Sequence, residues 1–320
     1  MHTSIRRLVA LFFIAAPIGF AARADSLVLN DKEYFSKRGL DVLVFNNVYD
    51  GLFSDAKIAG IELIHHGVRT ATNGDVRLSP TPEQWDPTPA VKERSVDRPT
   101  GAIHVRLHYP QHQFEYSIHA RPSESGIALQ VIFDRPLPWT LEGKAGFNLE
   151  FLPSAYFERT YLLDQKSGVF PLYPFGPTAR DAQGEAKRLP LAVGHALTLA
   201  PEDPERRVTI TSKDTTLGLF DGRNQAQNGW FVVRSDLPAG KTGVVLEWTL
   251  TANTIANWVR PVVIGHSQVG YHPEQQKRAV LETDPNAPAP ASATLLKISA
   301  DGAMTNAFTA SPQLWGDYLR

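Results

Sequence analysis

The chain has 320 residues, with 32 basic and 33 acidic side chains and no cysteine. Without cysteine it cannot form disulfides, thiolate metal sites, a cysteine nucleophile or a lipoprotein anchor. Apolar residues make up 42% of the sequence, which is enough for packed cores and excludes a largely disordered protein. The charges nearly balance and no Lys/Arg cluster suits a phosphate backbone, so we do not expect nucleic acid as a partner.

The chain begins with an apolar run, Leu8 to Ala22, that follows two arginines. Its length of about 15 residues is short of the roughly 20 needed to span a bilayer, which disfavours an anchor helix. A small-x-small pattern ends at Ala24, as at a signal-peptidase site. We predict a signal peptide over residues 1–24, cleavage after Ala24, and a secreted or periplasmic protein without a membrane anchor after cleavage.

Apolar and polar residues alternate with a period of two over much of residues 25–260, which is typical of half-buried β-strands. Turn signals separate these segments, and no amphipathic helix or internal repeat is visible outside the leader. We therefore expect an all-β protein with one large antiparallel β-sandwich over residues 25–260. The predicted strands are 42–45, 103–109, 114–119, 127–133, 147–152, 208–212, 230–234 and 244–250.

Two tryptophans lie on predicted strands. In the strand 244–250, Val244, Leu246 and Trp248 are expected to point to one face because alternate residues of a strand share a face. Trp230 and Trp248 are both predicted to be core residues.

Three histidines fall on one predicted hairpin. His104 and His108 share a strand face, and His119 faces out from the next strand. Three imidazoles could bind zinc in a catalytic-type site. A polar solvent-exposed face opposite Val105 and Leu107 explains the same pattern, and no acidic ligand lies in a tight motif with the histidines. We therefore predict no metal site and no cofactor.

Proline-rich segments at residues 80–89 and 171–177 are predicted to be ordered surface loops. Trp85 lies in the first, and Tyr173 and Phe175 lie in the second. Planar rings stack on the apolar faces of sugars, and a proline-stiffened loop would hold an exposed ring in position. These three residues are the candidates for carbohydrate binding. The alternative is that the rings cover the edges of the sandwich and are half buried.

A second module is expected after residue 260. Residues 265–273 read Gly-His-Ser-Gln-Val-Gly-Tyr-His-Pro, and residues 277–281 read Lys-Arg-Ala-Val-Leu. This pattern resembles the opening of the immunoglobulin-like module that precedes the catalytic barrel in many glycoside hydrolase family 9 enzymes, the cellulases and their relatives. The resemblance implies an immunoglobulin-like β-sandwich over residues 261–320, which would be partial because such a domain needs about 100 residues. The matching positions are Gln268, Gly270, Tyr271, Pro273, Lys277 and Ala279, with Ser267 where the family usually has Asn.

The large first domain carries a second resemblance. Residues 65–78, which include Asn73-Gly74-Asp75, and residues 80–87 are similar to the β-rich region found ahead of the immunoglobulin-like module in some bacterial family 9 proteins. This resemblance implies an architecture and no activity.

We assign no catalytic residue to the chain. The family 9 barrel takes its base from an Asp-x-x-Asp-type motif and its acid from a distant Glu, and neither context is present here. Residues 265–269 come close to the Gly-x-Ser-x-Gly elbow of serine hydrolases around Ser267. However, Val269 occupies the last glycine position, and Pro273 opposes the helix that must follow.

The resemblances imply a non-catalytic N-terminal region of a secreted family 9 glycoside hydrolase, which supports or positions the catalytic domain. The parent enzyme would use a barrel absent from this chain to hydrolyse O-glycosyl bonds in β-glucan or cellulose-type polysaccharide. The expected partners of the chain are therefore this catalytic barrel and the polysaccharide. The alternative is a stand-alone secreted carbohydrate-binding β-sandwich protein. Whether the chain itself is an enzyme is left open. A further strand-like pattern begins at Leu314, and residues 262–320 alone are expected to be poorly stable.

Overall fold

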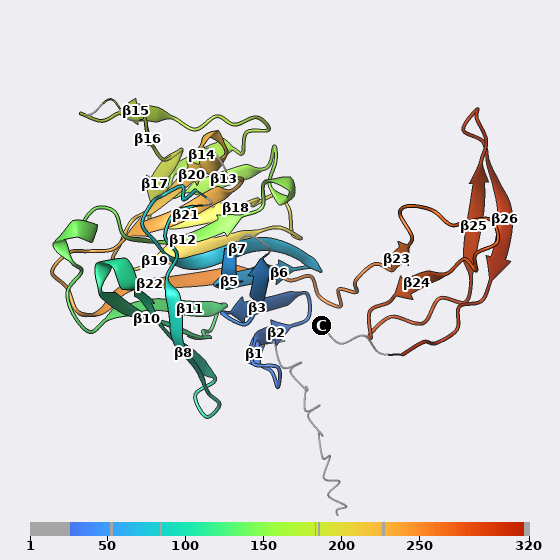
Figure 1. Ribbon diagram of the computed structural model, residues 1–320, viewed down its shortest axis with the longest axis horizontal. Coiled ribbons are helices and arrows are strands. Elements are labelled where there is room, and N and C mark those ends of the chain that lie inside the picture. Colours follow the sequence, from blue (N-terminus) through green and yellow to red (C-terminus); the bar gives the residue numbers. More distant parts are fainter. Residues whose placement is uncertain are drawn as a thin grey trace, which may run out of the picture.

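The computed structural model describes residues 26–51, 54–83, 85–182, 184, 186–225 and 228–316. The predicted signal peptide lies outside these residues. Within them the chain forms β-strands and short 3-10 turns and no α-helix (Figure 1). Consequently, no helix in the described ranges is long and apolar enough to cross a membrane.

Two nine-stranded antiparallel sheets form the body of the protein, which confirms the predicted all-β sandwich. In spatial order the first sheet contains β1 (Val28–Leu29), β2 (Phe35–Lys37), β3 (Leu40–Val44), β6 (Ile61–His65), β7 (Val68–Arg77), β12 (Gly146–Phe151), β21 (Phe231–Asp236), β20 (Leu217–Asp221) and β17 (Ala192–Gly194). The second sheet contains β14 (Lys166–Val169), β13 (Thr160–Leu163), β18 (Ala196–Leu199), β19 (Val208–Ser212), β22 (Gly243–Ala252), β11 (Ile127–Phe133), β10 (Phe114–Pro122), β9 (Ala102–Tyr109) and β8 (Ala90–Asp97).

Four small two-stranded sheets complete the described structure. Short 3-10 turns join several strands, among them η1 (Pro110–His112), η2 (Trp139–Leu141), η3 (Pro153–Ala155) and η4 (Gly222–Asn224). The small sheets are β4 (Val48–Gly51) with β5 (Ser54–Ile58), β15 (Thr178–Arg180) with β16 (Ala186–Arg188), β23 (Val263–His266) with β24 (Ala279–Glu282), and β25 (Ala293–Ile298) with β26 (Met304–Ala310).

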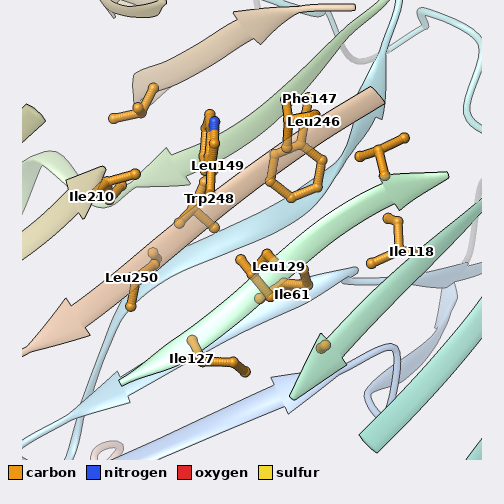
Figure 2. Packing of buried hydrophobic residues seen from close by; sticks show 14 of the residues in the cluster. Ile61, Ile118, Ile127, Leu129, Phe147, Leu149, Ile210, Leu246, Trp248 and Leu250 are labelled. Carbon is orange, nitrogen blue, oxygen red and sulfur yellow. The ribbon is translucent and has the colours of Figure 1, made fainter. Parts of the chain in front are cut away.

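The core lies between the two nine-stranded sheets and takes side chains from both, among them Ile61 and Phe147 of the first sheet and Leu129 and Trp248 of the second (Figure 2). Trp248 is fully buried there, as predicted, with its ring edge-on to Phe147 at a centroid distance of 4.9 Å. Its indole N–H would be costly to bury alone, and it donates to the hydroxyl of Ser235 at 3.0 Å. The prediction for Trp230 was wrong, because this residue precedes β21 and is only partly buried. Phe231 takes the inward position instead.

A β-bulge overturns one predicted side-chain direction in β22. Val131 pairs with Leu246 and Ile132 pairs with Val244, so Val245 is an additional residue in β22. An extra residue reverses the alternation on one side of the bulge. Val245 is therefore buried, whereas Val244 is 52% exposed and does not share the face of Leu246.

Residues 261–316 form two separate hairpins beyond the sandwich, β23–β24 and β25–β26 (Figure 1). Every residue of β26 is exposed, so this region has no packed core among the described residues. Its identity as an immunoglobulin-like domain stays a prediction. The strand-like pattern from Leu314 does not form a strand as far as Gly316, where the backbone has no neighbouring strand to pair with, and residues 317–320 lie outside the described ranges.

Candidate carbohydrate-binding surface

The three aromatic candidates project into solvent. Trp85 is 68% exposed, and Tyr173 and Phe175 are each 78% exposed. Rings at these exposures do not fill an edge of the sandwich, so the half-buried alternative does not describe them. We call Trp85, Tyr173 and Phe175 the aromatic platform.

A buried arginine fixes the loop that carries Tyr173 and Phe175. The Arg223 side chain, 9% exposed, donates through Nη1 to the carbonyl of Leu172 at 2.9 Å and through Nη2 to that of Pro171 at 2.7 Å. Nη2 also reaches the carbonyl of Tyr173 at 3.2 Å. A planar guanidinium with several fixed donors suits this multiple recognition of main-chain oxygens. Arg223 thereby holds three consecutive residues of the loop in place.

Asp221 and two phenylalanines hold Arg223 in turn. Its Nε and Nη2 donate to the two carboxylate oxygens of Asp221 at 2.8 and 2.9 Å, a bidentate ion pair whose acidic partner is fully buried. The guanidinium also lies 5.1 Å from the ring centre of Phe157 and 4.5 Å from that of Phe231. Such contacts favour a cation that has been removed from water. Asp221 further accepts the backbone N–H of Phe175 at 2.9 Å, so the same carboxylate positions both the arginine and the loop.

The loop lies directly on the turn that contains Arg223. Asn224 donates to the carbonyl of Gly176 at 2.9 Å. A Cβ at Gly176 would come within 2.9 Å of the carbonyl oxygen of Asp221, which explains a glycine next to Phe175.

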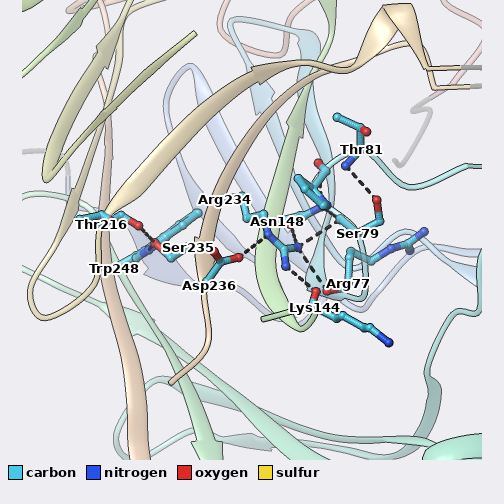
Figure 3. Close-up of polar contacts among 11 residues, drawn as sticks. Arg77, Ser79, Thr81, Lys144, Asn148, Thr216, Arg234, Ser235, Asp236 and Trp248 are labelled. Carbon is cyan, nitrogen blue, oxygen red and sulfur yellow. Dashed lines mark hydrogen bonds and ion pairs between the residues drawn. The ribbon is translucent and has the colours of Figure 1, made fainter. Parts of the chain in front are cut away.

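A second buried arginine fixes the segment that leads to Trp85 (Figure 3). Arg234 donates through Nη1 to the carbonyl of Ser79 at 3.1 Å and to Oδ1 of Asn148 at 2.9 Å. Asn148 itself donates to the carbonyl of Ser79 at 3.1 Å. Burial lowers the pKa of Arg234 from its ordinary value, and Asp236, 2.8 Å from Nε, opposes this by favouring the charged form.

One segment contacts both loops of the platform. The amide of Gln225 donates to the carboxylate of Glu83, and Asn228 donates to the carbonyl of Pro82 at 2.9 Å. On the other side, Asn224 donates to the carbonyl of Gly176 in the Tyr173 loop, and Arg188 of β16 donates to Gln225 at 2.9 Å and to the carbonyl of Asn224 at 2.8 Å. The structure therefore ties the Trp85 loop and the Tyr173 loop to the chain between β20 and β21.

The histidines do not gather into a three-ligand site. His104 and His119 are paired across β9 and β10, and their rings stack with centroids 4.0 Å apart. Burial, and then the neighbouring His104, lower the pKa of His119. His108 lies further along β9, with Nδ1 3.4 Å from the carbonyl oxygen of Ala90. In the described ranges no group of three or more potential ligand side chains is arranged to hold a metal ion.

Ser267 takes part in an ordinary turn between β23 and β24. Its hydroxyl donates to the carbonyl of Gly270 at 2.7 Å, and its backbone N–H donates to the hydroxyl of Tyr271 at 3.1 Å. No helix follows it among the residues described up to Gly316, so the geometry of a nucleophile elbow is not formed.

The sequence indicates the three rings but not the residues that position them. Nothing local in the sequence marks Asp221, Arg223 or Arg234 as a loop anchor. Arg223 is 50 residues from Tyr173, and Arg234 is 155 residues from Ser79. No protein-family model matches the chain, and a search of curated proteins finds no relative.

Proposed function

We propose that the chain is a secreted, non-catalytic carbohydrate-binding region of a family 9 type glycoside hydrolase, and that the aromatic platform holds polysaccharide for the catalytic barrel. The observation that carries the proposal is the fixed display of Tyr173 and Phe175, each 78% exposed on a loop that a buried arginine holds. Leaving a large apolar side chain in water forfeits about 1.5–3 kcal/mol of burial. A ligand that covers the rings recovers this energy.

The rigidity of the platform favours a saccharide. Sugars offer flat apolar faces flanked by hydroxyls, and a ring that is already positioned loses little conformational entropy on binding. Asn224 lies next to this loop, because its side-chain amide donates to the carbonyl of Gly176, the residue after Phe175. The motif at residues 265–281, with its resemblance to family 9 proteins, supports β-glucan or cellulose-type polysaccharide as the ligand class.

Binding of cellohexaose, measured by calorimetry, and retention on insoluble cellulose test this function. We expect Trp85→Ala, Tyr173→Ala and Phe175→Ala each to weaken binding by about tenfold, the equivalent of 1.4 kcal/mol. The matched control is Phe308→Ala, which removes a ring 62% exposed on β26, away from the platform, and should leave affinity unchanged. Wild-type affinity in all three platform variants would exclude the platform as the binding surface.

We propose a second role for the hairpins β23–β26, as the surface that contacts the catalytic barrel. Ile298, Met304 and Phe308 are 65%, 65% and 62% exposed there, which is an unusual density of apolar side chains for a free surface. Hydrogen exchange of the β25–β26 amides, with and without a family 9 catalytic barrel joined to the chain, tests this role. Protection should increase in the joined protein; equal exchange in both would count against the contact. A stand-alone binding protein, the alternative function, would retain the platform and show no such contact.

A further inference from the structure

A second exposed tryptophan lies outside the aromatic platform. Trp139 is 82% exposed and begins the 3-10 turn η2 in the connection between β11 and β12. Leu137 and Leu141, on either side of it, are 4% and 1% exposed and anchor the connection in the core. The N–H of Leu141 donates to the carbonyl of Pro138 at 2.9 Å, which closes the turn. Trp139 is therefore held outward by a short segment fixed at both ends.

A hollow lies beside this turn. It measures about 380 Å³, within the range of 300–1,000 Å³ that is usual for small-molecule sites. The β11–β12 connection forms one wall, up to Pro138, and the start of β10 forms the other. Phe114, 3% exposed, ties this second wall to the core. Trp139 is the residue after Pro138, where this wall ends.

The polar side chains of the hollow are available to a ligand. Gln113, Asp134 and Arg135 line it, and in the described part of the chain no hydrogen bond or ion pair engages their side chains. Gln113 has a left-handed backbone with φ of 49°, an uncommon conformation for a residue with a side chain. This conformation ends the turn η1, where the N–H of Gln113 donates to the carbonyl of Pro110 at 3.3 Å.

The charges of the hollow favour a neutral ligand. Glu115 also lines it, but its carboxylate is paired with Lys92. Asp134 and Arg135 contribute opposite charges. A carboxylate, a guanidinium and an amide together can accept and donate hydrogen bonds with neighbouring hydroxyls of a sugar, while an indole ring stacks on its apolar face. A uronate would instead need an excess of positive charge.

We propose that this hollow is a second saccharide-binding site, in which Trp139 stacks on a neutral hexopyranose while Gln113, Asp134 and Arg135 bind its hydroxyls. The site stands on different loops from the aromatic platform and does not depend on it. Two sites in one chain increase the apparent affinity for a long polysaccharide over that for a short oligosaccharide, because the second contact becomes intramolecular.

The indole N–H signals of the full chain test the site directly by NMR. The chain has six tryptophans, and Trp139→Phe identifies the signal of Trp139. We expect millimolar cellohexaose or mannohexaose to shift that signal, and Asp134→Ala to weaken the response by about tenfold. The control is Trp315, 85% exposed outside both surfaces, whose signal should not move. All of these side chains are exposed, so an unchanged melting temperature will show that the variants fold.

The outcomes separate this site from the platform. A Trp139 shift that persists in Tyr173→Ala/Phe175→Ala supports an independent second site, even if the platform itself does not bind. A shift that disappears in that variant overturns the independent site. No shift of Trp139 with either hexasaccharide also overturns it, whatever the platform does.

Discussion

Replacing Arg223 with alanine tests whether a buried ion pair builds the aromatic platform. The change removes the five hydrogen bonds that Arg223 makes to Asp221 and to the loop carbonyls of Pro171, Leu172 and Tyr173. Removing one partner of a buried pair costs about 3–5 kcal/mol, because the other charge stays buried and unpaired. Asp221 keeps the backbone N–H of Phe175, which places the expected loss near the lower end, at about 3 kcal/mol.

Urea unfolding followed by tryptophan fluorescence measures this loss. A double-mutant cycle with Asp221→Asn isolates the pair, and we expect a coupling energy of about 2 kcal/mol or more. The control is Arg106→Ala, which removes an arginine 51% exposed and 3.6 Å from Glu93 and should cost about 0–1 kcal/mol. The same Arg223→Ala protein should also lose saccharide affinity at the platform. A loss of stability below about 1 kcal/mol, or additive single variants, would refute the reasoning.

Three further predictions follow from the buried groups and the hairpins. Burial raises the pKa of Asp75 to about 7, so the folded state binds the proton of its carboxyl group more tightly than the unfolded state does. The contribution of Asp75 to stability therefore falls as the pH rises from about 4 to about 7. The amide oxygen of an Asp75→Asn variant can still accept the hydrogen bond from Tyr116. The free energy of unfolding of this variant should therefore increase relative to wild type across this pH range, by about 4 kcal/mol at most. Parallel pH profiles of the unfolding free energies of the two proteins would contradict this. Burial lowers the pKa of His65 to about 4, so its contribution to stability rises with pH over the same range. This contribution is the same in both proteins and cancels in the comparison. Trp248→Ala should destabilise the sandwich by about 3–5 kcal/mol in urea unfolding, because the side chain is fully buried; a loss near zero would mean that the core repacks. The amides of β25 and β26 should exchange with deuterium far faster than those of β12, whose six residues are all buried, and equal protection would show a packed core in the hairpins.

The sequence by itself determined the fold class and most strands. The strands 127–133 and 208–212 coincide with β11 and β19, because a period of two follows from the geometry of the strand itself. Prolines also marked the loops that carry Trp85 and Tyr173. Each of these features depends on residues that are close together in the sequence, so each can be recognised without the tertiary structure.

Only the tertiary structure decided the features that depend on register and on distant partners. The bulge at Val245 arises from the pairing of β22 with β11, which local alternation cannot reveal. The roles of Arg223 and Arg234 depend on carbonyl groups that folding brings to them from distant parts of the chain. The exposure of Trp139 likewise follows from two flanking leucines that reach the core. A side chain's contacts are set by which strands become neighbours, and that choice is made by the whole sandwich and not by any single segment.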